Sequence, residues 1–452
     1  MKIIIAGGGK IGMTLAQHLT KEGHDLTIID QKASVLETAQ ERFDAFVLAG
    51  NCASRETLLS AGIREADLLI TATNADEVNL LSCMTAHGLN KNLHTIARIR
   101  NPEYSEQIMT MRDVFPLSLT VNPERRTAQE IERLLKYPGF LRRDTFAKGR
   151  AELVELRIDA ASKLCNVALS DLNSVVSCQV LVCAVLRAGT AIAPKGNFIL
   201  QDGDRVFVTA PTEQLTRLLK NLGIITRRVR NVMLCGGSRV TYYLASALCA
   251  DGISVKIIEK DLARCQELAA LLPDASVIQG NCNNQSILEN QGIRDCDALV
   301  TLTGLDETNM VVSLYGESCG VPQIITKLSH GENIIIGDTM KLGSMISPRE
   351  LCSNIIVRYV RAMENQTGAA ISVHSIADGQ VEAVEFLVDD TTKNRGIPLK
   401  QMKLKPDILL ASITRGSRTQ VPNGDAYIQT GDTVVVVTGG RGALQQLNDI
   451  FA

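Results

Sequence analysis

The chain contains two copies of one sequence module, and this repeat limits the possible folds more than any other feature. The segment that starts at Lys2, KIIIAGGGKIGMTLAQHLTKEGHDLTIID, aligns with NVMLCGGSRVTYYLASALCADGISVKIIE, which starts at Asn231, at an offset of 229 residues. Further along, residues 67–79 align with residues 297–309 at an offset of 230, and seven of the thirteen positions are identical. A chain of 452 residues built in this way predicts repeated domains rather than one large core.

Each half of the chain contains two units. Late in the first half, ELVEL at residue 152 and APKGNFILQDGDRVFV at residue 193 match EAVEF at residue 382 and VPNGDAYIQTGDTVVV at residue 421. The order is therefore A-B-A-B, with a longer A unit and a shorter B unit. We predict the A units at residues 1–140 and 229–365 and the B units at residues 145–226 and 370–452. Glycine, proline and charge interrupt the apolar pattern at joints near residues 138–150, 226–230 and 365–370.

The A unit has the pattern of an α/β domain. In the first half, short β-branched runs alternate with stretches of helical period, and the predicted strands are residues 3–6, 26–29, 45–48, 68–71 and 94–99. This alternation is typical of a Rossmann-like parallel sheet. The B unit instead has short alternating strands, P-x-G and G-D turns, and a closing amphipathic segment such as residues 213–222, which predicts a small α+β domain.

The composition excludes several classes of function. The formal net charge is −2 with an isoelectric point near 6.4, which argues against a dedicated nucleic-acid binder. Aromatic residues make up only 4% of the chain and tryptophan is absent, so base-stacking platforms are not expected either. The longest nearly apolar run, residues 175–186, falls short of the roughly 20 residues that cross a bilayer. Because the N-terminus reads as a buried strand and not as a cleavable leader, we expect a cytoplasmic chain.

The twelve cysteines are scattered along the chain and form no C-x-x-C pair. Most of them lie in apolar runs, so we interpret them as small buried hydrophobic residues in a reducing compartment. The six histidines are equally dispersed, and none has a second histidine or an acidic residue at metal-ligand spacing. We therefore predict no metal site.

A glycine motif carries the chemistry of the first A unit. Gly7-x-Gly9-x-x-Gly12 follows a strand and opens a helix, and Asp30 ends the next strand. This arrangement is the dinucleotide-binding fingerprint: the glycines allow a tight turn, a close backbone approach to the pyrophosphate and close packing of helix against strand. Asp30 is placed to accept hydrogen bonds from ribose hydroxyls and to repel a 2′-phosphate, which favours NAD over NADP. The alternative is a purely structural glycine turn.

The other strand ends of this unit carry polar side chains. Each of them either contacts a nucleotide or serves as a loop cap or a surface charge. These residues are Asn51, Thr71, Thr73, Asn74, Arg98 and Arg100. Arg98 is the stronger candidate for a phosphate contact, because Lys327 keeps a cation at the aligned position of the second copy.

The glycine motif is degraded in the second copy. Gly236 and Gly237 remain, but Ser238 replaces the second glycine of the motif and Thr241 replaces the third, while Glu259 keeps the acidic position. A serine Cβ at the closest backbone approach is expected to crowd a pyrophosphate. We therefore predict a weaker or altered site there, for instance one that takes a mononucleotide with Arg239 on its phosphate.

Together these residues resemble the tandem RCK (KTN) proteins, the cytosolic regulatory subunits of Trk-type potassium uptake systems. The resemblance covers essentially the whole chain. It rests on GGGKIG with Asp30, on the T-x-T-x-x-D-E-x-N blocks at Thr71 and Thr301, on ARIRNPEY at Ala97, and on the N-P and S-P helix openings at Asn122 and Ser347. The B units add a duplicated series of R-x-G, P-x-G and G-D, or close variants of it.

The resemblance implies tandem Rossmann-like lobes, each followed by a small α+β RCK-C lobe, in a ring of four chains. This homotetramer would dock beneath a TrkH- or TrkG-like potassium-transporting membrane subunit, on the cytoplasmic face of the inner membrane. NAD(H), or ATP/ADP at the same or the second site, would set the shape of the ring, and no catalytic residue is implied. Carried over to this chain, and with Asn51 from the strand ends, the nucleotide contacts fall on Gly7, Gly8, Gly9, Lys10, Ile11, Asp30, Asn51, Thr73, Asn74 and Arg98. In the second half they fall on Gly236, Gly237, Ser238, Arg239, Val240, Glu259, Thr303, Gly304 and Lys327.

Two other functions remain as alternatives. An NAD-dependent dehydrogenase needs a proton-transfer residue in a substrate domain, but the B units contain a single histidine, His374. A redox sensor could use Cys52 and Cys282, which occupy equivalent G-N-C positions, although descent from one ancestral unit also explains them. A nucleotide-sensing regulator accounts better for duplication of the whole A-B unit.

Overall fold

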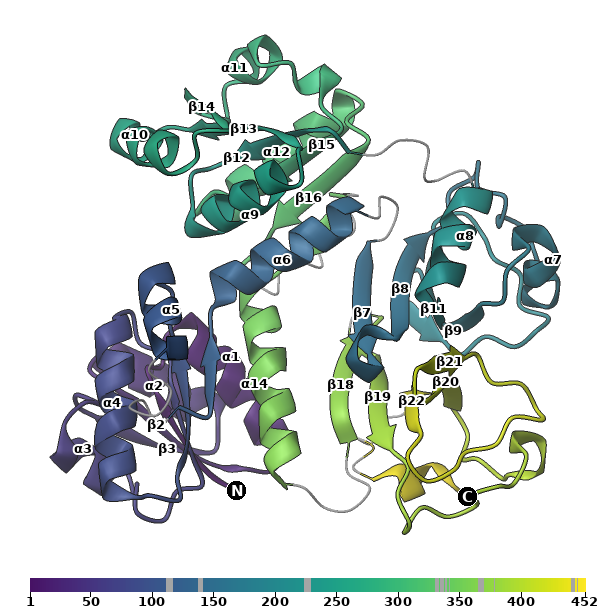
Figure 1. The fold of residues 1–452 in the computed structure, drawn as a ribbon, viewed down its shortest axis with the longest axis horizontal. Helices are drawn as coiled ribbons and strands as arrows, with labels where there is room; N and C mark the ends of the chain where they lie inside the picture. Colours follow the sequence, from purple (N-terminus) through teal and green to yellow (C-terminus); the bar gives the residue numbers. More distant parts are fainter. Residues whose placement is uncertain are drawn as a thin grey trace. The chain divides into compact units, whose positions relative to one another are not determined.

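The computed structural model describes the chain except for residues 111–116, 137–140, 223–228, 330–332, 334–336, 338–339, 341, 365–369, 378, 440–443 and 445. The described residues form four sheets, two of six strands and two of five (Figure 1). The six-stranded sheets are parallel and the five-stranded sheets are antiparallel. The predicted fold class is therefore confirmed.

The first A unit is a Rossmann-like domain with strand order β3-β2-β1-β4-β5-β6. Its elements are β1 (Lys2–Ala6), α1 (Lys10–Lys21), β2 (Asp25–Asp30), α2 (Ala33–Arg42), β3 (Ala45–Ala49), α3 (Arg55–Ser60), β4 (Leu68–Thr71), α4 (Asp76–Leu89), β5 (His94–Arg98), α5 (Pro102–Thr110), β6 (Leu119–Val121) and α6 (Pro123–Lys136). The five predicted strands are confirmed to within one residue at each end. The sixth, β6, is only three residues long and gave no periodic signal.

The second A unit repeats this arrangement with strand order β14-β13-β12-β15-β16-β17. Its elements are β12 (Asn231–Cys235), α9 (Arg239–Ala250), β13 (Ser254–Glu259), α10 (Leu262–Leu271), β14 (Ser276–Gln279), α11 (Gln285–Asn290), η3 (Ile293–Asp295), β15 (Ala298–Thr301), α12 (Asp306–Ser318), β16 (Gln323–Lys327), β17 (Ser344–Ile346) and α14 (Pro348–Glu364). The central strands β1 and β12 are buried apart from their first residue, as expected for a parallel sheet covered on both faces.

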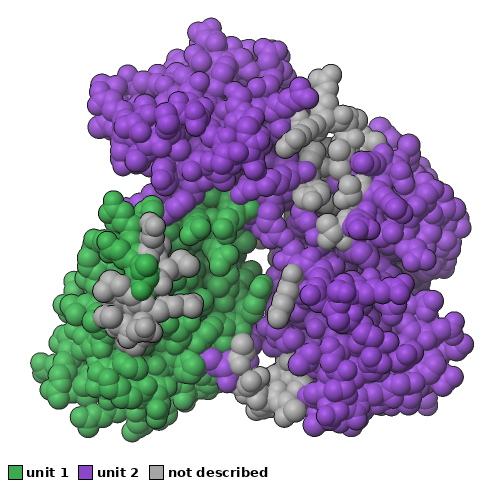
Figure 2. Space-filling view, in the orientation of Figure 1, with its two compact units in different colours: residues 1–129, 347–360 green, residues 130–346, 361–452 purple. Residues whose placement is uncertain are grey.

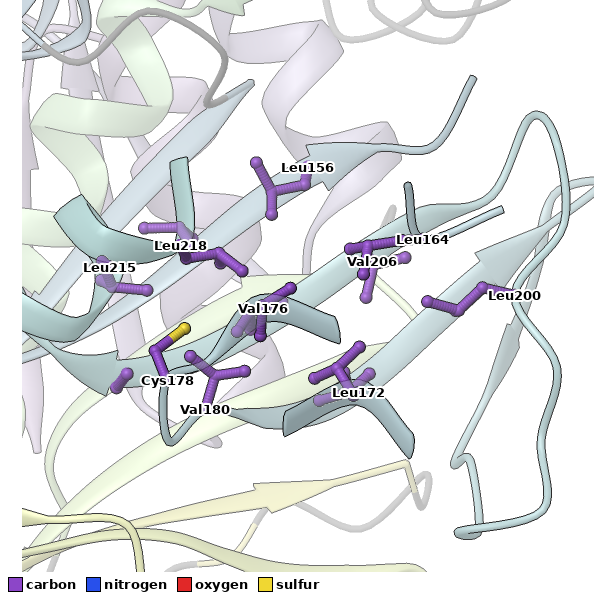
Figure 3. Close-up of a cluster of buried hydrophobic side chains, with 14 of the residues drawn as sticks. Leu156, Leu164, Leu172, Val176, Cys178, Val180, Leu200, Val206, Leu215 and Leu218 are labelled. Atoms are coloured by element: carbon purple, nitrogen blue, oxygen red, sulfur yellow. The ribbon is translucent and has the colours of Figure 1, made fainter. Parts of the chain in front are cut away.

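The first B unit forms a lobe with sheet order β10-β9-β11-β8-β7. Its elements are β7 (Arg142–Phe146), η1 (Ala147–Gly149), β8 (Ala151–Arg157), η2 (Leu169–Asp171), α7 (Leu172–Val176), β9 (Leu181–Arg187), β10 (Thr190–Ile192), β11 (Arg205–Pro211) and α8 (Thr212–Leu222). Figure 3 shows its core, a buried cluster to which α7 contributes Leu172 and Val176, α8 contributes Leu215 and Leu218, and the sheet contributes residues such as Val206. The predicted closing helix corresponds to α8.

The second B unit has the equivalent sheet order β18-β19-β22-β20-β21. Its elements are β18 (Ala370–Ile376), β19 (Val381–Leu387), η4 (Leu399–Gln401), β20 (Ile408–Arg415), β21 (Arg418–Gln420), β22 (Thr433–Thr438) and η5 (Leu447–Ile450). The two lobes share a buried cluster, which we call the lobe interface. Its members are Phe146, Ala147, Ala151, Leu153, Cys183, Ala184, Leu186, Phe207, Ile376, Ala377, Val381, Ala383, Ala411, Val435 and Val437.

The chain divides into two compact units (Figure 2). The three points at which the chain passes from one unit to the other lie within or next to α6 or α14. Unit 1 comprises residues 1–129 and 347–360, and unit 2 comprises residues 130–346 and 361–452. In unit 1, Glu350 and Tyr359 of α14 hydrogen-bond to His18 and His94 of the first A domain at 3.1 and 2.7 Å. In unit 2, the carbonyl of Leu134 in α6 accepts a 2.8 Å bond from Gln323. The last helix of each A unit thus packs partly with the other copy.

The predicted domain boundaries at residues 140, 226 and 365 lie outside the described residues and stay predictions. The joint expected at residues 138–150 is partly wrong, because β7 and η1 lie within it and β7 pairs with β8. The sequence RRDTF did not predict a strand because it is charged, but β7 lies at the edge of its sheet, where charged side chains are common. Among the described residues, no helix is both long and apolar enough to cross a membrane.

Candidate functional site

The candidate site lies at the carboxyl edge of the first parallel sheet. Because β1 separates β2 from β4 and all strands run in parallel, the segments that follow β1, β2 and β4 meet where the strand order reverses. The glycine loop follows β1, Asp30 ends β2, and Thr73 and Asn74 follow β4. The structure therefore brings these predicted residues together at the switch point of the sheet.

Two glycines of the loop are required by the backbone geometry of the first copy. Gly7 has φ +103°, and a Cβ there would lie 2.9 Å from the backbone of Ala72 and Thr73. A Cβ on Gly12 would lie 2.0 Å from the carbonyl oxygen of Gly7, so this glycine lets α1 pack closely against β1. Both positions confirm the roles that the spacing predicted for the turn and for the helix–strand contact.

Gly9 differs from these two, because nothing in the fold requires it. It is exposed, its φ of −66° suits any residue, and a Cβ at this position would have no heavy atom of the described chain within 4 Å. Gly9 is the N-cap of α1 and supplies no capping side chain, although serine or aspartate would stabilise the helix there. The backbone N–H groups at the start of α1 are left open to an anion.

Asp30 holds the glycine loop in place. Its Oδ2 accepts a 2.8 Å hydrogen bond from the backbone N–H of Gly8, and its Oδ1 accepts a 2.9 Å bond from the N–H of Lys32. A carboxylate has about four lone-pair sites, so capacity remains for two ribose hydroxyls. Asp30 is half-buried and stands at the position that the fingerprint assigns to ribose recognition.

A buried asparagine joins the segments after β4 and β5. The Oδ1 of Asn79 accepts bonds from the N–H and the hydroxyl of Thr73 at 2.9 and 2.7 Å, and its Nδ2 donates to the carbonyl of Arg98 at 2.8 Å. The hydroxyl of Thr71 is fully buried and donates to the carbonyls of Asn79 and Ile96. Thr71 is therefore a structural residue, and Thr73 is the threonine that borders the site.

Asp76 makes a second link of this kind. Its Oδ2 accepts 2.7 Å bonds from the N–H groups of Arg100 and Asn101, and the guanidinium of Arg100 also donates to the carbonyl of Asn74. Arg100 thus links the segments that follow β4 and β5, and Asn74 is exposed. The D-E-x-N block is visible in the sequence, but no role was predicted for Asp76 or Asn79. The duplicated spacing was the signal that could have identified both.

Arg98 is a partly satisfied cation at the end of β5. Its guanidinium lies 3.4 Å from Oε1 of Glu124 in the first turn of α6. Within the described chain, Nε of Arg98 and Oε2 of Glu124 are buried without a hydrogen-bond partner. Burial disfavours the charged form and lowers the pKa of Arg98 from its ordinary value, although Glu124 opposes this. Spare donor capacity on a buried arginine fits a site that receives an anion.

The remaining predicted residues of the first site lie around the loop. Lys10 is exposed at the first position of α1, and Ile11 is buried beneath it. Asn51 is exposed after β3, where its Oδ1 accepts a 3.0 Å bond from the N–H of Ala53. Asn51 therefore serves as a loop cap in this structure, and its contact with a nucleotide stays a prediction.

The second glycine loop satisfies its own hydrogen-bond donors. Gly236 keeps a φ of +104°, as Gly7 does. The hydroxyl of Ser238 caps α9 by accepting a 3.3 Å bond from the N–H of Thr241, and the Thr241 hydroxyl donates to the carbonyl of Gly236. The Gly236 carbonyl is equivalent to the Gly7 carbonyl, which a Cβ on Gly12 would strike in the first copy. In the second copy, Thr241 hydrogen-bonds to this carbonyl instead. One of the N–H groups that could bind an anion is already occupied.

An arginine also covers this loop. Arg264 of α10 donates a 2.6 Å bond to the carbonyl of Gly237, whereas the aligned residue of the first copy is Val35. Glu259 accepts hydrogen bonds from the N–H groups of Gly237 and Asp261, as Asp30 does in the first copy. Arg264 was not predicted, because its sequence position lies outside the fingerprint.

The other predicted residues of the second site keep the arrangement of the first. Asn309 accepts bonds from the N–H and hydroxyl of Thr303 at 2.9 and 2.7 Å and donates to the carbonyl of Lys327 at 2.9 Å. Arg239 and Gly304 are exposed, and Val240 is buried. The acid and amide links are therefore shared by both copies, while the glycine loops differ.

The residues of the two alternative functions lie elsewhere. His374 is buried between the B lobes, where its Nδ1 lies 2.9 Å from Oδ1 of Asp144. Burial raises the pKa of Cys52, whereas a hydrogen bond with Cys235 lowers the pKa of Cys282. The pKa values of the two G-N-C cysteines are thus shifted in opposite directions, despite their equivalent place in the repeat.

Family comparisons match most of the chain. The TrkA-N domain family matches residues 3–114 and 232–348, and the TrkA-C domain family matches residues 153–223. The Trk system potassium uptake protein TrkA of Halomonas elongata is 28% identical over 100% of this chain and 98% of its own length. The TrkA homolog of Archaeoglobus fulgidus is 30% identical over 100% of both chains.

Solved structures share the fold. The GsuK channel bound to NAD has a TM-score of 0.62 at 16% identity, covering 97% of this chain and 76% of that one. GsuK bound to ADP has a TM-score of 0.51 at 14% identity, covering 80% of this chain and 69% of that one. The likeness extends over both copies of the repeat.

Proposed function

Because the chain belongs to the TrkA family of Trk system potassium uptake proteins, we propose that it is a nucleotide-sensing regulatory subunit that gates a Trk-type potassium transporter. Its partner is a TrkH- or TrkG-like membrane subunit, and its place is the cytoplasmic face of the inner membrane. Four chains form the ring that carries the signal. The chain acts by binding and not by catalysis.

Gly9 carries this proposal. A glycine that neither the backbone conformation nor packing requires, at the N-cap of the helix that follows β1, leaves backbone donors open to a phosphate. The aligned Ser238 demonstrates that a capping side chain fits at this place in the fold. The absence of such a cap in the first copy favours a ligand over a structural turn.

The ligand of the first site is NAD(H). Asp30 lies one strand from the glycine loop, where it accepts hydrogen bonds from ribose hydroxyls and repels a 2′-phosphate. Arg98 and Lys10 supply positive charge to the phosphates, and Thr73 and Asn74 border the other side of the switch point. GsuK, which shares this fold, has been solved bound to NAD and bound to ADP, and these two structures support a nucleotide ligand here.

The second site has a different ligand or a weaker affinity. Ser238 occupies a helix donor that a pyrophosphate would use, and Arg264 lies against the loop. We expect ATP, ADP or another mononucleotide at this site, held at Glu259, Arg239 and Lys327. Two different sites let one chain compare two nucleotides.

The mechanism is a shift between two states of the ring. A ligand shifts such an equilibrium only by the difference between its affinities for the two states, which is typically worth about 1–3 kcal/mol per site. Several sites in one ring sum to the roughly 5.5 kcal/mol that turns a mostly closed gate into a mostly open one. Hydrolysis is not needed for this step.

The test is Gly9→Val, measured by NADH binding and by potassium uptake into vesicles that hold the transporter subunit. The new side chain points into open space, so the fold is retained while the approach of a phosphate is blocked. We expect NADH affinity to fall by about tenfold or more and the response of uptake to NADH to be lost. Gly88→Ala is the matched control, because its Cβ also meets open space but lies in α4. Unchanged NADH binding in Gly9→Val would contradict the proposal.

A further inference from the structure

The lobe interface joins equivalent positions of the two copies. Asp144 of β7 and His374 of β18 are separated by the repeat offset of 230 residues. They also hold the same register, since Asp144 pairs with Leu153 of β8 and His374 pairs with Ala383 of β19. Equivalent positions of the two lobes therefore face each other, as expected when two homologous domains are related by a pseudo-two-fold axis.

At this position the two copies have become chemically complementary. Nδ1 of His374 lies 2.9 Å from Oδ1 of Asp144, and the two side chains are only 8% and 12% exposed. The histidine ring also packs edge-on against Phe146, with ring centroids 4.7 Å apart. An acid meets a base here, where a symmetric pair of identical lobes would bring together two copies of one residue.

A second contact shows the same divergence. Oε1 of Glu385 accepts a 2.9 Å bond from the N–H of Ala147 in the other lobe, and its Oε2 accepts a 2.7 Å bond from Ser372. The equivalent residue of the first lobe, Glu155, is instead bound by Arg205 of its own lobe. Thr433 stands at the aligned position of Arg205 in the second lobe, which leaves Glu385 available to cross the interface.

The exposed hydrogen bonds of the interface, by contrast, are made from equivalent positions of both lobes. Gln380 donates a 2.7 Å bond to the carbonyl of Gly189 and accepts a 3.0 Å bond from the N–H of Ala191. Arg150, at the equivalent position of the first lobe, donates to the carbonyl of Gly416. These contacts position the lobes but do not distinguish one lobe from the other.

We propose that Asp144–His374, assisted by Glu385–Ala147, is a recognition pair that makes the first TrkA-C lobe bind the second lobe and reject the identical lobe of another copy. Two first lobes would bring Asp144 against Asp144, and two second lobes would bring His374 against His374. Two buried carboxylates cannot both remain charged at such a distance without a large cost. The divergence thus specifies the partner by disfavouring the wrong one.

The test is a charge-swap cycle in the full chain, read by hydrogen exchange of β7 and β18. Asp144→His and His374→Asp each place like residues opposite each other, and the double variant D144H/H374D restores an acid and a base in exchanged places. We expect exchange of both strands to become about tenfold faster or more in each single variant and to return close to the original rate in the double variant.

Failure of the double variant to recover protection would overturn the proposal, as would unchanged exchange in both single variants. If the single variants do not fold, Asp144→Asn keeps the side-chain shape and removes the charge. In this variant the amide hydrogens of β7 and β18 are expected to exchange faster than in the unaltered chain. Unchanged exchange would again overturn the proposal. The exposed pair Lys400–Asp425 is the matched control, and its charge swap is expected to leave exchange unaltered.

Discussion

At the scale of single residues, the glycine loop contains glycines of two kinds. Gly7 and Gly12 are demanded by the backbone, through a positive φ and a close helix–strand contact. Gly9 is demanded by neither, since a Cβ at this position would meet open space. Substitutions at these positions therefore separate effects on stability from effects on binding.

Gly12→Ala is expected to destabilise the first domain by about 1–3 kcal/mol, because its Cβ would lie 2.0 Å from the Gly7 carbonyl and force α1 away from β1. Gly9→Ala is expected to cost only about 0.5–1 kcal/mol, because its Cβ meets open space and alanine is merely a poorer N-cap than glycine. Denaturant unfolding of both variants compares them directly. Equal losses of stability would show that the loop glycines do not divide in this way.

Much of the site could be predicted at this scale from spacing. Gly7, Gly12 and Asp30 act through their own backbone or through a neighbouring strand, so a short sequence window reveals them. Arg264 could not be predicted, because it reaches the second glycine loop from a helix whose orientation only the fold determines. The side-chain cap of Ser238 could have been inferred from its place before α9.

At the scale of elements, the T-x-T-x-x-D-E-x-N block fastens a helix to two strand ends. Asn79 and Asn309 make the same three contacts in their own domains, with distances that agree closely. The block was recognisable in the sequence as a repeat. Its structural role was not, since the carbonyls of Arg98 and Lys327 approach the asparagines only in the folded sheet.

Asn79→Ala is expected to destabilise the first domain by about 1–3 kcal/mol, because buried backbone groups lose their partners. Asn309→Ala is expected to have an effect of similar size on the second domain. Thermal unfolding of each variant provides the measurement. A loss in one domain without a comparable loss in the other would contradict the equivalence of the two links.

The buried cysteines are expected to make the stability of the fold depend on pH in the alkaline range. Burial raises the pKa of Cys83, Cys183 and Cys352 to about 12, so the folded state favours the neutral thiol. The stability that this provides is fully present below the unfolded pKa of about 9 and is lost as the pH rises toward 12. We expect stability to fall between about pH 9 and 12, and replacement of Cys83 by alanine to reduce this slope. A slope that does not depend on Cys83 would contradict this cause.

At the scale of the whole molecule, the repeat predicts the order of the domains but not how their last helices are shared. The N-P and S-P openings at Asn122 and Ser347 indicated where α6 and α14 begin, yet residues 130–136 pack in unit 2 and residues 347–360 pack in unit 1. Two homologous domains offer similar surfaces to either helix, so pattern alone does not identify the partner. Each of these two helices therefore has one part in unit 1 and another part in unit 2.

The proposed sensing function would use this arrangement of α6. Arg98 of the first site lies beside Glu124 of α6, and α6 continues from unit 1 into unit 2. Under the proposed function, a ligand that recruits Arg98 would act on an element that belongs to both units. A ligand at about 100 times its dissociation constant adds about 2.7 kcal/mol to the stability of the binding-competent state, which is enough to shift such an equilibrium.

Equilibrium titration of the full chain with NADH, followed by analysis of the recovered nucleotide, tests the central claim most directly. We predict saturation at one tight dinucleotide site per chain, a rise in unfolding temperature, and NADH that is chemically unchanged even in the presence of a metabolite extract. Steady oxidation of NADH would contradict a regulator and favour an enzyme. Two identical tight sites per chain would contradict the difference between the two glycine loops.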